Sequence, residues 1–129
     1  MLRLLARFWA KRKYIWTLET EAAANELNAG LSARRADEKK KLVAQLNDET
    51  EAIYKNIEAQ EQSEEYKALA GQDKYEADRE KNDAKKIAES KRQTAAEEEK
   101  NAENGEATAK HFRQQAANSR ATADRIRKL

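Results

Sequence analysis

The stretch that decides the fold runs from Ala88 to Ala123 and reads AESKRQTAAEEEKNAENGEATAKHFRQQAANSRATA. Alanine recurs in it at every seventh residue, six times without a miss: Ala88, Ala95, Ala102, Ala109, Ala116 and Ala123. A strict seven-residue stripe lies on one face of an α-helix and is typical of a coiled-coil seam. Alanine at each step permits a neighbouring helix to approach closely. We therefore predict one long helix over residues 72–129, with Gly105 tolerated inside it.

The preceding segment, residues 31–70, has a different period. Its large aliphatic residues step by four, seven and four, and these residues are Leu42, Leu46, Ile53 and Ile57. Alternate members are eleven residues apart, and a repeat of eleven favours straight or weakly right-handed helix packing. The segment is predicted to be a second helix with a Leu/Ile stripe, and these four residues join the six alanines as the predicted helix seam.

Glycines mark the predicted ends of these helices. Gly30, after Asn28 and Ala29, is typical of a helix C-terminus, and Ser32 is a good N-cap for the next helix. Gly71 is followed by Asp73, a second capping residue. Two all-α arrangements fit: a helical hairpin that turns at Gly71, or one extended coiled-coil rod that continues through it and pairs with a second chain. The capping residues favour the hairpin slightly.

Residues 1–29 form the third predicted element, a basic amphipathic N-terminal helix. Its large apolar residues lie on or near one helical face, which we define as the docking face: Leu2, Leu5, Phe8, Trp9, Ile15 and Trp16. The basic residues of this segment lie mostly elsewhere on the helix, and no acidic residue occurs before Glu19. Such a helix is typical of an interfacial membrane anchor.

Three receiving surfaces fit the docking face. An apolar groove of another protein is favoured, since amphipathic helices commonly dock in this way. An anionic membrane surface comes second. A mitochondrial targeting peptide comes third, because residues 1–7 are rich in arginine and free of acids. The interrupting charges argue against a secretory signal and against a membrane-spanning helix, so we expect no secretion by a signal peptide and no transmembrane helix, and the location is otherwise unknown.

Charge and composition both favour association. The net charge of +2 conceals basic ends, each of +5, that flank an acidic middle of −8. Large apolar residues are few beyond Gly71, so this half has little core of its own. We expect other protein subunits or self-association as partners, within a large assembly that is membrane-peripheral in one alternative. Nucleic acid is a weaker alternative, through the basic stretch from Lys110 to Lys128.

No residues suggest catalysis. The chain has no cysteine and one histidine, His111, and its acidic clusters are consecutive, so their side chains fan around a helix. We expect no catalytic residue, no metal site and no cofactor. The sequence predicts a non-enzymatic structural or assembly subunit, a helical strut or spacer attached by its N-terminal amphipathic helix. The alternative is a peripheral membrane- or nucleic-acid-binding helical module, such as an internal or scaffolding protein of a phage virion or an accessory subunit of a mitochondrial membrane complex.

Overall fold

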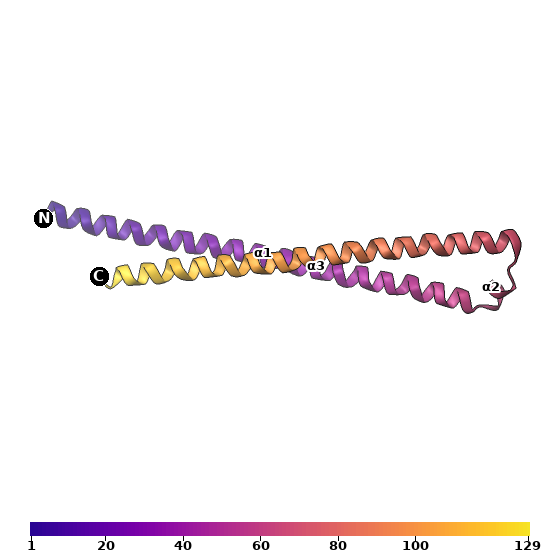
Figure 1. Ribbon diagram of the computed structural model, residues 1–129. Coiled ribbons are helices and arrows are strands. Elements are labelled where there is room, and N and C mark those ends of the chain that lie inside the picture. Colours follow the sequence, from indigo (N-terminus) through magenta and orange to yellow (C-terminus); the bar gives the residue numbers. More distant parts are fainter. The chain divides into compact units, whose positions relative to one another are not determined.

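The computed structural model describes all 129 residues and contains no strand. Its elements are α1 (Leu2–Gln62), α2 (Glu64–Ala68) and α3 (Gly71–Arg127), which Figure 1 labels along the chain. The all-α prediction is confirmed, and most of the chain lies in two long packed helices. Contacts group the residues into two units, the first made of Met1–Asp37 and Glu103–Leu129 and the second of Glu38–Ala102.

The predicted helix end at Gly30 is wrong, because α1 continues through it to Gln62. Residues 1–29 and 31–70 therefore do not form separate helices. A glycine inside a helix costs about 1 kcal/mol relative to alanine, which is small beside the packing of a long helix. Gly30 is exposed and its α-carbon faces open space, while its neighbour Ala29 is buried. Burial next to the glycine keeps the backbone helical where local propensity favoured an end.

The chain reverses through a short capped segment rather than at one glycine. Ser63 leaves the helical conformation, with φ −70° and ψ 146°, and its hydroxyl accepts a hydrogen bond of 3.1 Å from the Tyr66 amide. This N-cap ends α1 and begins α2, so the helix predicted to reach residue 70 stops at Gln62. Leu69 is extended, and Gly71 then takes a φ of 61°, a left-handed value that favours glycine. The third helix begins there, at Gly71.

The first unit is held together by alanines from both helices. Ala22, Ala29 and Ala36 of α1 and Ala109, Ala116 and Ala123 of α3 are all buried. The helices approach closely at Gly105, where an added β-carbon would stand 3.2 Å from the Ala36 β-carbon and 3.4 Å from the Ser32 carbonyl oxygen. A side chain at this position would therefore be more crowded than most β-carbons in proteins.

Ion pairs along the first unit show that its two helices are antiparallel. The Arg120 guanidinium donates two hydrogen bonds to the Glu26 carboxylate, at 3.0 and 2.8 Å. Farther toward the N-terminus of α1, Glu19 pairs with Arg127. Because these pairs are half-exposed, each contributes little to stability, but their positions show the register of the two helices.

The second unit combines small residues of α3 with larger ones of α1. Ala88, Ala95 and Ala102 are buried, as are Thr50 and Ile57. The ammonium of Lys39 lies 2.7 Å from Glu98, and that of Lys91 lies 2.7 Å from Glu49. These pairs also join early residues of one helix to late residues of the other, so the helices of this unit are antiparallel as well.

The eleven-residue stripe expected in α1 is not its buried stripe. Leu42 is 40% exposed, Leu46 and Ile53 are half-buried, and of the four predicted residues Ile57 alone is buried. Burial in α1 follows a seven-residue spacing instead, through Ala22, Ala29, Ala36, Val43, Thr50 and Ile57, of which Val43 is half-buried. Two helices that pack along a shared seam must present it at the same period. Burial in α1 and α3 therefore shares one seven-residue period.

Candidate docking surface

The first turns of α1 are exposed. Every residue from Met1 to Ala10 is exposed, although the segment is helical from Leu2 onward. The first buried residue of the chain is Leu18. Helix formation in this segment therefore leaves half or more of each large apolar side chain in contact with solvent.

The docking face defined from the sequence is largely bare in the structure. Leu2, Leu5, Phe8, Trp9 and Trp16 are 84%, 50%, 55%, 68% and 65% exposed, in that order, and Ile15 is half-buried. These large apolar side chains all lie within the first sixteen residues of the helix. Large exposed apolar patches are characteristic of sites that meet another surface.

Helix geometry divides the docking face into two parts. At about 100° per residue, Leu2, Leu5, Trp9 and Trp16 fall within an arc of about 60°. Phe8 and Ile15 lie on a neighbouring arc, nearer to the side on which Leu18 is buried. The arc of Leu2, Leu5, Trp9 and Trp16, which we call the indole face, thus points away from the side of α1 that packs on α3.

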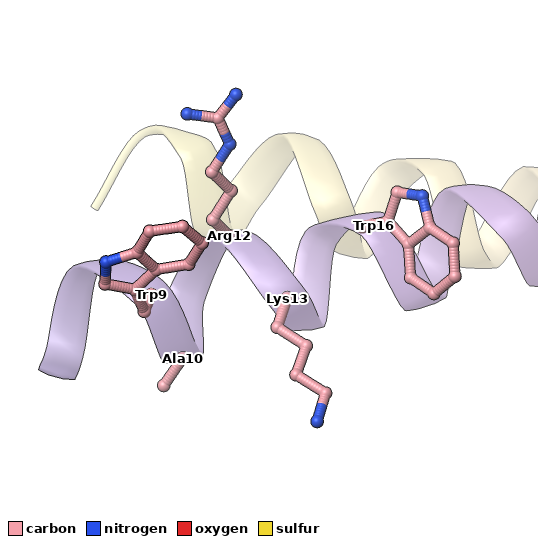
Figure 2. Close-up of a pocket in the computed structure, with 5 residues that line it drawn as sticks. All are labelled: Trp9, Ala10, Arg12, Lys13 and Trp16. Atoms are coloured by element: carbon pink, nitrogen blue, oxygen red, sulfur yellow. The ribbon is translucent and has the colours of Figure 1, made fainter.

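A shallow groove of about 420 Å³ lies on the indole face. Trp9, Ala10, Arg12, Lys13 and Trp16 line it, and apolar atoms dominate its lining. Figure 2 shows the two indole rings spaced along α1, with Arg12 and Lys13 extending toward opposite edges. The side chains of arginine and lysine carry their charge at the end of an apolar stem, so they can border an apolar surface and still reach water.

A second groove, of about 260 Å³, lies beside the other part of the docking face. Phe8, Lys11, Arg12 and Ile15 of α1 line it together with Arg127 of α3. The basic C-terminal end of α3 thus lies next to the basic N-terminal segment. Arg127 is also the partner of Glu19, the first acidic residue of the chain.

The cations of the N-terminal segment lack acidic partners. No acid lies within residues 1–18, and none of the five basic side chains there forms an ion pair in the structure: Arg3, Arg7, Lys11, Arg12 and Lys13. Farther along the chain, pairing is common. The N-terminal end of α1 therefore carries positive charge that no acidic side chain neutralises.

The most strongly perturbed pKa values lie elsewhere, around α2. Tyr66 donates a hydrogen bond to Asp78 and accepts one of 3.2 Å from Lys81, and Lys81 also pairs with Glu61 at 3.2 Å. The Tyr66 hydrogen bond lowers the pKa of Asp78, and the hydrogen bonds that Lys81 donates to Tyr66 and Glu61 raise the pKa of Lys81. Each perturbed group is matched by a partner that satisfies it. This cluster therefore fastens the connecting segment to α3.

Two further carboxylates are held by lysines across the second unit. Hydrogen bonding from Lys91, then from Gln45, lowers the pKa of Glu49. Hydrogen bonding from Lys39 lowers the pKa of Glu98 in the same way. Both effects favour the charged carboxylates that tie α1 to α3.

Neither a metal centre nor a membrane span emerges from the structure. No three His, Cys, Asp or Glu side chains lie close enough together to hold a metal ion. None of the helices has a stretch both long and apolar enough to cross a membrane.

The predicted alanine seam of α3 is buried at all six positions, from Ala88 to Ala123. Sequence reasoning missed its counterpart in α1, the alanines at 22, 29 and 36, whose seven-residue spacing was visible in the sequence. The expected helix end at Gly30 hid this stripe by splitting it between two elements.

Comparison with family models, with curated proteins and with solved structures found no match for this chain.

Proposed function

We propose that this protein is a non-enzymatic structural subunit of a larger assembly. In this proposal α1 and α3 form a helical hairpin of coiled-coil type that serves as a strut or spacer, and the N-terminal segment of α1 attaches it to its site. The observation that carries the proposal is the small-residue seam, shared by both helices and close-packed where Gly105 meets Ala36.

A seam of this kind suits a spacer better than a binding pocket. Alanine and glycine bring two helix backbones together and leave no room for a ligand between them. The contact consists of many small van der Waals interactions distributed along the helices, and these are large in sum. At about 1.5 Å per residue, the 57 residues of α3 give a length of about 85 Å. Length is the property that a spacer contributes.

Attachment through the N-terminal segment follows from where apolar surface remains. The seam uses residues from Leu18 onward, while the docking face stays exposed before it. Binding at this end would therefore leave the helix pairing intact. A subunit with separate pairing and attachment surfaces can be fixed at one end without losing its structure.

The nucleic-acid alternative is less well supported by the contacts at the C-terminal end. Of the bases between Lys110 and Lys128, Arg120 is held by Glu26 and Arg127 by Glu19 and Asp124. Phosphate binding would have to compete with these partners. The cations of residues 1–18 face no such competition, which favours the N-terminal segment as the attachment site.

Distance measurement along α3 tests the spacer proposal. The chain has no cysteine, so Lys85→Cys and Lys110→Cys can carry the only two spin labels. Both positions are exposed, and a continuous helix separates their backbones by about 38 Å. A narrow distribution near this value is expected in the full-length chain. A broad distribution, or one centred at a much shorter distance, would overturn the proposal, because a bent or unfolded α3 fixes no length.

A further inference from the structure

We propose that the indole face binds the surface of an anionic phospholipid membrane, with α1 lying along the interface over its first four turns. The inference rests on the proposed function and deepens it by naming the surface to which the spacer attaches. Three features carry it: the orientation of the face, its charge and the positions of its indoles.

Orientation leaves the indole face accessible. Leu18 and Ala22 are buried, and they define the side of α1 that packs on α3. By helix geometry the indole face lies about 100° or more around the helix from these residues. A flat surface can therefore meet Leu2, Leu5, Trp9 and Trp16 together without displacing α3.

Charge complementarity selects an anionic surface. Five cations and no acid occur in residues 1–18, and none of the five is neutralised within the chain. Arg3, Arg7 and Lys11 lie on the side opposite the indole face, while Lys13 borders it. Anionic headgroups at an interface can meet bordering cations on a helix that is embedded to half its depth.

The arrangement within the face favours lipid over a protein groove. Arg12 lies at the edge of the indole face and lines the same groove as both indoles. A protein groove that is apolar up to this edge would bury its guanidinium without a partner, which is costly. At a membrane interface its long side chain can extend to the headgroups. Tryptophan suits the same depth, because its ring is apolar and its N–H finds polar partners at the interface.

Binding to vesicles tests the inference with a reporter that the chain already carries. Its two tryptophans, Trp9 and Trp16, both lie on the indole face, so intrinsic tryptophan emission reports on this surface alone. The full-length chain is titrated with vesicles of phosphatidylcholine containing phosphatidylglycerol, and with vesicles of phosphatidylcholine alone. We expect a blue shift and co-sedimentation with the anionic vesicles, and markedly weaker binding to the neutral ones. Binding should weaken as salt rises, because screening shortens the reach of the charges.

Variants test whether binding depends on the indole face or on any exposed apolar side chain. Trp9→Ala with Trp16→Ala should lower the affinity for anionic vesicles by about tenfold or more, measured by co-sedimentation. The matched control is Tyr75→Ala with Ile87→Ala, which removes two exposed apolar side chains from α3 and should leave binding unchanged. Both variants alter exposed positions, so far-UV circular dichroism should match that of the wild type. Equal loss in both variants would overturn the inference.

The remaining outcomes are also decisive. No blue shift with anionic vesicles at low salt would refute lipid binding and leave an apolar protein groove as the surface for this face. Equal binding to neutral and anionic vesicles would refute the role of charge. Failure here is distinguishable from failure of the spacer. A narrow label distance along α3 without binding to vesicles would refute this inference alone. Binding to vesicles with a broad label distance would refute the spacer proposal alone.

Discussion

Substituting alanine for glycine at two positions of this chain should have opposite consequences. In a helix interior the change normally stabilises by about 1 kcal/mol, because alanine has the higher helix propensity. Gly30 has no atom within 4 Å of an added β-carbon, so Gly30→Ala should gain this amount. At Gly105 the new carbon would lie 3.2 Å from the Ala36 β-carbon and 3.4 Å from the Ser32 carbonyl oxygen. The helices must separate or bend there to admit it.

The expected magnitude follows from comparing the two effects. Overpacking of a tight interface typically costs about 1–3 kcal/mol. When the propensity gain of about 1 kcal/mol is subtracted from this cost, Gly105→Ala should lower the free energy of unfolding by between zero and about 2 kcal/mol. The two variants should therefore differ by about 1–3 kcal/mol in the free energy of unfolding. Urea unfolding followed by far-UV circular dichroism measures this difference, since the extrapolated free energies are compared within one chain.

A double-mutant cycle with Ala36 makes the test specific to the helix contact. Ala36→Gly alone should destabilise by about 1 kcal/mol through its lower propensity. In combination it should relieve the crowding of Gly105→Ala, so that the double variant is more stable than the sum of the single ones by about 0.5 kcal/mol or more. Equal gains for Gly30→Ala and Gly105→Ala, together with additive behaviour in the cycle, would refute the close approach of the two helices at this point.

Two further predictions concern the seam and its ion pairs. Ala109→Leu, at a buried seam position, should lower the free energy of unfolding by about 1–3 kcal/mol. Ala107→Leu, at an exposed position two residues away, should change it by less than about 0.5 kcal/mol. Similar values for the two variants would show that the seam has been assigned to the wrong face. Lysine partners lower the pKa of Glu49 and of Glu98 below the ordinary 4.5, so their stabilisation is present above that pH and is lost as pH falls through the lowered values. Replacing both glutamates by Gln should therefore make the urea midpoint less sensitive to acid. Glu58→Gln, at an exposed position without an ion pair, should leave this sensitivity unchanged. Identical pH profiles for the wild type, the double variant and the control would contradict the role assigned to these pairs.

The parts of the fold that sequence predicted correctly are those with strict periodicity. Helical structure follows from composition and from the absence of proline, and the long helix over Ala88–Ala123 follows from an unbroken seven-residue stripe. Helix boundaries were predicted less well, because capping signals are local while packing is not. Gly30 and Ser32 together resemble a helix end and a new start, yet buried Ala29 and Ala36 on either side keep α1 helical. The reversal instead uses Ser63, whose capping role depends on the extended conformation that it adopts.

The tryptophans of the N-terminal segment lie outside the seam. Where Gly105 meets Ala36, even one added methyl group would be crowded, so no indole or phenyl ring fits at that point. Trp9 and Trp16 occupy a helix face that α3 leaves exposed. A structural role within the chain gives no reason for two tryptophans at exposed positions of an acid-free segment. Contact with a surface outside the chain does, because such contact would bury the apolar rings and meet the bordering cations at the same time.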